Sequence, residues 1–157
     1  MLAVVGCGNS NRSDDGVGVF VAQSLQQRLQ SSPRNDVRVF DAGTGGMEVM
    51  FHARGASKLI IVDASNSGSA AGAIFEVPGA QVQREHAPSF SLHDFRWEHA
   101  LAAGRRIFRE QFPAEVSVLL IEAQSLAFGL ELSPSVRAAA ERVIADLSQV
   151  IDAYRGE

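Results

Sequence analysis

Short apolar runs alternate along the chain with longer amphipathic segments, and this alternation predicts an α/β fold. The apolar runs predict five strands, at residues 2–6, 37–40, 59–62, 73–77 and 116–121. Apolar residues at helical spacing predict helices over 16–30 and 95–111, with a short helix in the glycine-bounded stretch 43–55. A last helix is expected to begin after Ser133, which suits the N-cap, with Pro134 at its first position.

The order of these segments predicts a doubly wound sheet. Strands that alternate with helices form mostly parallel sheets through right-handed crossovers. The run 59–62 is apolar at every position, as in a central strand covered on both faces. We therefore expect a single domain over residues 1–157, with a mostly parallel, twisted, five-stranded sheet and helices on both faces. The polar stretch 64–72, rich in small residues, is expected to be a loop.

Composition and charge narrow the class of protein. The chain of 157 residues has a formal net charge of −4, so no broad basic surface for nucleic acid is expected. It has one cysteine, so no disulfide can form within the chain. Its first residues lack the features of a signal peptide, and no stretch reaches the length of a membrane span. We expect a cytoplasmic protein that binds neither nucleic acid nor membrane.

Acidic residues follow three of the predicted strands. Asp14 and Asp15 lie in the turn GCGNSNRSDDGVG after the first strand. Asp41 ends the second strand, and Asp63 ends the third. In open α/β sheets, sites form where the carboxyl ends of parallel strands meet at one edge. Asp15 alone is explained equally well as a helix cap. Three acids at one edge would repel one another, however, and a cation would relieve that repulsion.

A histidine in the loop before helix 95–111 can reach the same edge. His93 stands in the stretch PSFSLHDF, after the fourth strand. Each of the four histidines, taken alone, is more typical of an ordinary surface or capping residue. Together, however, Asp15, Asp63 and His93 would offer two carboxylates and one imidazole. This ligand set suits Zn²⁺ or Ni²⁺ better than Ca²⁺ or Mg²⁺.

Other chemistries fit the sequence less well. The glycines of the first turn and Asp41 resemble parts of a dinucleotide-binding fingerprint. A pyrophosphate at the helix start would meet Asp14 and Asp15, which oppose it electrostatically. The chain has no G-x-S-x-G turn and no P-loop. Cys7 follows a buried strand, which favours a core position, and a nucleophilic pair of Cys7 with His93 has no local signature to support it.

Five segments, in order along the chain, resemble the motifs of the [NiFe]-hydrogenase maturation proteases. GNSNRSDDGVG resembles the motif GNxLxxDDGxG, DAGTGGMEVM the second-strand motif D-x-G-T-x-G, and LIIVDA the third-strand segment. SLHDF is similar to the S-x-H segment, and FGLELSPSVRAAAERVI to the G-L-S/T-P start of the last helix. Two departures occur: Asn11 replaces the usual leucine, and residues 122–125 lack the usual proline, which is consistent with a different hydrogenase group as substrate.

This resemblance implies an activity. Proteases of the family remove a short C-terminal extension from the precursor of the hydrogenase large subunit once nickel has been inserted. Their metal-contacting positions fall on Asp15, Asp63 and His93, and Asp41 matches the aspartate of the second-strand motif. The resemblance implies a monomeric, aspartic-type endopeptidase that activates its hydrogenase and has these four residues as its catalytic set. The cofactor it implies is nickel carried by the substrate, or another divalent transition metal.

Two mechanisms and one alternative function stay open. The enzyme could use its own metal to polarise the scissile carbonyl and activate water. Alternatively, Asp15, Asp63 and His93 could grip nickel that the precursor already holds, with Asp41 helping to activate the water. The sparse ligand set favours the second mechanism. The alternative function is that of a non-catalytic checkpoint protein, which binds the nickel-loaded precursor without cleaving it.

Overall fold

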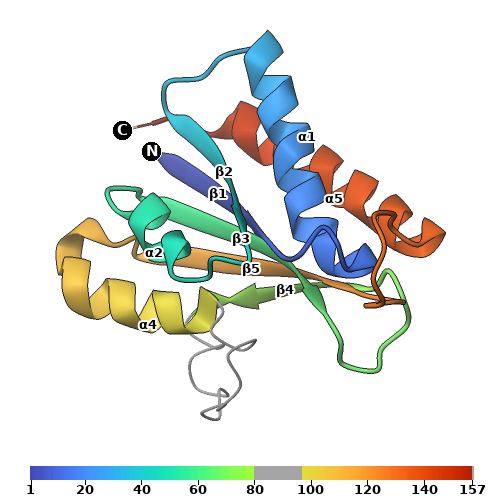
Figure 1. Ribbon diagram of the computed structural model, residues 1–157. Helices are drawn as coiled ribbons and strands as arrows, with labels where there is room; N and C mark the ends of the chain where they lie inside the picture. Colours follow the sequence, from blue (N-terminus) through green and yellow to red (C-terminus); the bar gives the residue numbers. More distant parts are fainter. Residues whose placement is uncertain (80–96, 157) are drawn as a thin grey trace.

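Five strands form one sheet with helices on both of its faces (Figure 1). The computed structural model describes residues 1–79 and 97–156. The strands are β1 (Leu2–Cys7), β2 (Val37–Gly43), β3 (Lys58–Ser65), β4 (Ile74–Pro78) and β5 (Glu115–Glu122), in the spatial order β2-β1-β3-β5-β4. Only the pairing of β4 with β5 is antiparallel among these strands. The predicted doubly wound, mostly parallel sheet is therefore confirmed.

The helices lie close to their predicted places. They are α1 (Val17–Ser31), α2 (Glu48–Ala53), α4 (Trp97–Phe108) and α5 (Pro134–Ala153), with 3-10 turns η1 (Ser13–Gly16) and η3 (Arg109–Gln111). The segment predicted as one helix to residue 111 changes to η3 after Phe108, where Arg109 adopts a positive φ of 48°. Within residues 1–79 and 97–156, no helix is long and apolar enough to cross a membrane.

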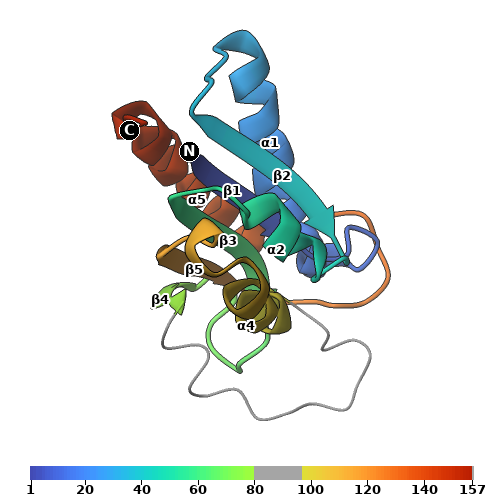
Figure 2. The same cartoon turned by 90° about the vertical axis from the view of Figure 1, so that its left-hand side faces the viewer.

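Each face of the sheet has its own hydrophobic core. Figures 1 and 2 show α1 and α5 on one face and α2 and α4 on the other. Successive residues of a strand point to opposite faces. In β1, Leu2 and Val4 therefore pack under α1 and α5, whereas Ala3 and Val5 pack under α2 and α4. This alternation fixes which face each residue at the end of a strand belongs to.

The first turn of α1 lies directly against the carboxyl ends of β1 and β3. A Cβ atom on Gly18 would come within 2.2 Å of the carbonyl oxygen of Val62 and 2.4 Å of that of Cys7. A Cβ atom on Gly6 would come within 2.1 Å of the carbonyl oxygen of Gly18. Only glycine allows main chain to approach main chain this closely, so Gly6 and Gly18 let the start of α1 pack directly against the sheet.

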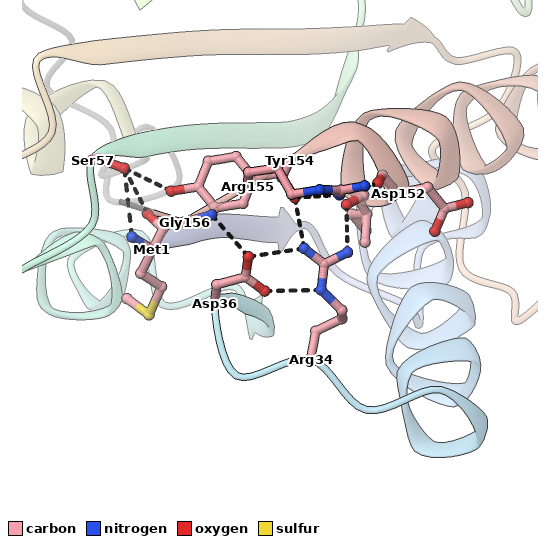
Figure 3. A network of polar contacts seen from close by, with 9 residues as sticks. Met1, Arg34, Asp36, Ser57, Asp152, Tyr154, Arg155 and Gly156 are labelled. Carbon is pink, nitrogen blue, oxygen red and sulfur yellow. Dashed lines mark hydrogen bonds and ion pairs between the residues drawn. The ribbon is translucent and has the colours of Figure 1, made fainter.

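A polar network lies at the amino ends of β1, β2 and β3 (Figure 3). Arg34 donates two hydrogen bonds to the Asp36 carboxylate, and further ones to the carbonyl oxygens of Ile151 and Tyr154 at the end of α5. The hydrogen bonds from Arg34, together with the Gly156 amide, lower the pKa of Asp36 to about 2. The network joins the C-terminal segment to the amino ends of the strands, whereas the acids of the predicted site lie at the carboxyl ends.

The close packing at Gly18 yields a stability prediction. Helix propensity alone predicts that Gly18→Ala stabilises the protein by about 1 kcal/mol. The contact with the Val62 and Cys7 carbonyl groups predicts the opposite, a loss of about 2 kcal/mol or more, because the main chain of the sheet has no room to move. Urea unfolding followed by circular dichroism measures the difference. The control is Gln27→Ala, at an exposed position of the same helix. A Gly18→Ala protein as stable as wild type would contradict the packing argument.

Candidate active site

Asp14 and Asp15 are neighbours in η1, yet their side chains have different surroundings. Asp14 is fully buried, with 0% of its surface exposed, whereas Asp15 is partly exposed. The Asp14 carboxylate accepts four hydrogen bonds from the segment between β5 and α5. The donors are the amides of Gln124 (2.9 Å), Ser125 (2.9 Å) and Ser133 (2.7 Å), and the Ser133 hydroxyl (2.7 Å).

These hydrogen bonds keep Asp14 charged. Burial raises its pKa, but the donors from Ser133, Ser125 and Gln124 together hold the pKa below its ordinary value of 3.8. Ser133 is the N-cap of α5, as predicted, but its side chain makes no capping hydrogen bond and donates to Asp14 instead. The hydrogen bonds of Asp14 therefore hold the η1 turn against the segment that precedes α5.

The main chain of Asp15 and the carboxylate of Asp63 both lie near Gly8. The Asn9 amide donates to Oδ2 of Asp15 at 3.0 Å. Gly8 has a φ of +137°, and a Cβ atom there would lie 1.9 Å from the Asp15 carbonyl oxygen and 3.7 Å from Oδ1 of Asp63. The turn after β1 therefore places the main chain of Asp15 near the carboxylate of Asp63. Among contacts within the described residues, Oδ1 of Asp15 accepts no hydrogen bond.

Asp63 is held in a fixed orientation at the end of β3. Its side chain is only 3% exposed. The indole Nε1 of Trp97 donates to Oδ2 at 2.9 Å, and the Ala64 amide lies 2.8 Å from Oδ1. Trp97 is the first residue of α4 and is itself buried. The contact between Trp97 and Asp63 was not predicted from the sequence, although an indole donor near a strand-end acid was the available signal.

Asp41 lies at the same edge of the sheet but on the other face. Val37 and Val39 of β2 pack under α1 and α5, so Asp41 has the same orientation. Its carboxylate accepts hydrogen bonds from Gln23 of α1 (3.2 Å) and from the Gly43 amide (2.9 Å). Asp63 points to the face of α2 and α4, so the three strand-end acids share an edge without converging on one face.

The predicted third ligand, His93, lies outside the described residues. Among residues 1–79 and 97–156, no cluster of three or more His, Cys, Asp or Glu side chains could hold a metal ion. The proposed ligand set therefore rests on Asp15 and Asp63 in the structure and on the sequence for its imidazole. Cys7 is buried in the core under α2 and α4, which confirms the predicted core position.

A third buried carboxylate, which was not predicted from the sequence, lies at the end of β5. Glu122 is 1% exposed and accepts hydrogen bonds from Ser65, Ser67 and Ser69, which belong to the stretch predicted as a loop. Burial raises the pKa of Glu122, but these donors outweigh burial and lower it from the ordinary value of 4.5. These serines therefore solvate a buried charge, and Ser65 belongs to β3 rather than to the loop predicted from the sequence.

Comparisons with known proteins point to one family. A family model described as hydrogenase maturation protease matches residues 19–150. The chain is similar to the hydrogenase 2 maturation protease of Escherichia coli, with 30% identity over 155 residues that cover 98% of this chain and 90% of that protein. It is also 30% identical over 146 residues to the hydrogenase expression/formation protein HoxM of Cupriavidus necator, covering 92% of this chain and 70% of HoxM.

Solved structures agree with this assignment. The hydrogenase maturating endopeptidase HybD from E. coli has a similar fold, with a TM-score of 0.76, 28% identity, and coverage of 95% of this chain and 93% of that chain. The [NiFe] hydrogenase maturation protease HybD from Thermococcus kodakarensis gives a TM-score of 0.77 at 20% identity, covering 95% of this chain and 97% of that chain, and bears on the fold alone.

The buried carboxylate of Asp14 predicts a pH-dependent loss of stability on substitution. Asp14→Asn replaces an acceptor oxygen with an NH₂ group that faces the same donors, and should lower the free energy of unfolding at pH 7 by roughly 3 kcal/mol. Because folding lowers the Asp14 pKa, its contribution is complete above the ordinary value of 3.8 and disappears as pH falls through the lower folded value. The difference in the free energy of unfolding between wild type and Asp14→Asn should therefore decrease below pH 3.8.

Urea titrations between about pH 7 and pH 2.5 measure this difference. Asp146→Asn is the control, because Asp146 is exposed on α5 and its substitution should change stability by less than about 0.5 kcal/mol. If this difference in unfolding free energy stays constant over the whole pH range, the charge of Asp14 does not stabilise the segment before α5.

Proposed function

This chain belongs to the hydrogenase maturation protease family, and from that premise we propose that it removes the C-terminal extension of a [NiFe]-hydrogenase large-subunit precursor after nickel insertion. Membership makes the chain an endopeptidase of hydrogenase maturation, which favours cleavage over the alternative role of a non-catalytic checkpoint. The observation that supports the proposed site is that the main chain of Asp15 and the carboxylate of Asp63 both lie near Gly8, at the carboxyl ends of β1 and β3.

The two carboxylates suit a metal ion that arrives with the substrate. Asp63 is buried and oriented by Trp97, so it offers a fixed negative charge. Asp15 is partly exposed, and only Oδ2 accepts a hydrogen bond from the described part of the chain. In our proposal these two side chains and His93 contact nickel held by the precursor. Two carboxylates and one neutral imidazole would bind a metal ion resident in the enzyme only weakly. Recognition of nickel that the precursor already holds therefore explains this ligand set better.

Nickel recognition would make cleavage depend on metal insertion. A precursor without nickel would bring no cation to relieve the repulsion between Asp15 and Asp63, so its scissile peptide would not be held at these acids. A loaded precursor would relieve this repulsion and bring its scissile peptide to the same edge of the sheet. We assign Asp41 no contact with the nickel, because it faces α1; its predicted part in activating water is tested by Asp41→Asn.

Substitution of the two acids should abolish processing without unfolding the protein. Asp15→Asn and Asp63→Asn keep the side-chain volume and one acceptor oxygen, so hydrogen bonds from Asn9 and Trp97 can persist. Both lose the negative charge, and processing of nickel-loaded precursor should fall by about 100-fold or more. A gel shift of the large subunit measures cleavage, and circular dichroism checks the fold.

The matched control for this experiment is Asp146→Asn, which removes an exposed carboxylate from α5. It should process precursor at the wild-type rate. If Asp15→Asn and Asp63→Asn also process at that rate, the acids are structural and the proposed metal contact is wrong, even though the family assignment stands.

The isolated protein should bind Ni²⁺ weakly and in a pH-dependent way. Only neutral imidazole is a ligand, so protons compete with the metal ion at His93. With an ordinary histidine pKa of about 6.5, most of the affinity should be lost between about pH 7 and pH 5. Calorimetric titration of wild type and His93→Ala measures this dependence. Identical titrations for the two proteins, or a flat affinity over this pH range, would remove His93 from the ligand set.

A further inference from the structure

Two large apolar side chains stand in solvent next to the proposed site. Phe128 is 84% exposed and Leu130 is 81% exposed, the highest values among the large hydrophobic residues of the described chain. Both belong to the segment between β5 and α5, which lies beside the turn that precedes α1 (Figure 2). Exposed apolar groups next to a functional edge are typical of an interaction surface.

The main chain that carries these side chains is firmly held. Gly129 forms a β-bridge with Arg12, with hydrogen bonds of 2.9 Å from the Ser13 amide to Gly129 and from the Gly129 amide to Asn11. The Ser13 hydroxyl donates to the Ala127 carbonyl oxygen at 2.8 Å. Asp14 binds the segment on both sides of this bridge, at Ser125 and Ser133. The exposure of Phe128 and Leu130 is therefore built into the fold.

Neighbouring contacts show why the two side chains face outward. A Cβ atom on Gly129 would lie 2.8 Å from the Ser13 hydroxyl, so position 129 faces the turn of η1. The main chain bends at Phe128 and at Leu130, on both sides of the bridge residue, and both side chains are exposed. The guanidinium carbon of Arg12 lies 4.9 Å from the centroid of the Phe128 ring, a cation–π contact that restricts the ring.

We propose that Phe128 and Leu130 form a docking surface for an apolar segment of the large-subunit precursor, which rests on the proposed function. The same turn runs through Arg12 and Ser13 to Asp15, so the surface is continuous with the proposed nickel contact. A polypeptide bound there would be held close to the acids before and during cleavage. Its contact with this surface needs no nickel, because no ligand residue belongs to it.

Affinity for the precursor tests the surface separately from cleavage. The nickel-free precursor is the probe, because the proposed function predicts that it is not cleaved. The double variant Phe128→Ser, Leu130→Ser should weaken its binding about tenfold, as measured by isothermal titration calorimetry. With nickel-loaded precursor, the same variant should raise the half-saturating concentration by a similar factor and leave the maximal rate close to that of wild type.

Ile107→Ser is the matched control, since Ile107 is 61% exposed near the end of α4, and it should change neither quantity. Thermal unfolding should give the same Tm for all three proteins, because the substituted side chains are exposed. The docking surface is overturned if the double variant binds nickel-free precursor as wild type does, if wild type does not bind it, or if only the maximal rate falls. Failure of wild type to cleave loaded precursor would instead contradict the proposed function, whatever the affinities show.

Discussion

Main-chain contact between the first turn of α1 and the ends of β1 and β3 is the constraint from which the site follows. Without side chains at Gly6 and Gly18, the helix start can lie on the carbonyl groups of the sheet. The chain between β1 and α1 must then turn back within a few residues, and Gly8 allows this with a positive φ. The turn is thereby placed over the strand ends, and its two acids are placed with it.

The glycine-rich turn presents carboxylates where a nucleotide-binding turn presents amides to phosphate. The adjacent acids Asp14 and Asp15 have different surroundings, because Asp14 is buried in η1 whereas Asp15 is partly exposed. Taking a charge out of water is costly unless several donors replace the lost water. Asp14 meets this condition with four donors, and its charge in turn fixes the segment before α5. Asp15 keeps an oxygen without a hydrogen bond from the described residues, as a group that meets a cation should.

Local periodicity was enough to predict the fold and the positions of the acids along it. The run 59–62 showed a central strand, and an acid at its end had to lie at the edge where sites form. Period-two alternation in β2 could also have shown that Asp41 and Asp63 belong to different faces. The hydrogen bonds of Asp14 and the contact of Trp97 with Asp63 could not be predicted this way. Their partners are 110 to 119 and 34 residues apart in the chain, and no local pattern specifies such pairs.

The buried carboxylate of Asp14 links two requirements of a processing protease. In the proposed function, the enzyme holds a large precursor and places a metal contact within reach of one position on that precursor. Asp14 binds both ends of the segment that carries Phe128 and Leu130, and it is covalently next to Asp15. Movement of the apolar surface relative to Asp15 would therefore break hydrogen bonds to a buried charge, which is far more costly than bending an unanchored loop. The proposed docking surface and the proposed metal contact thus belong to one hydrogen-bonded unit, in which the DDG turn sets the spacing between them.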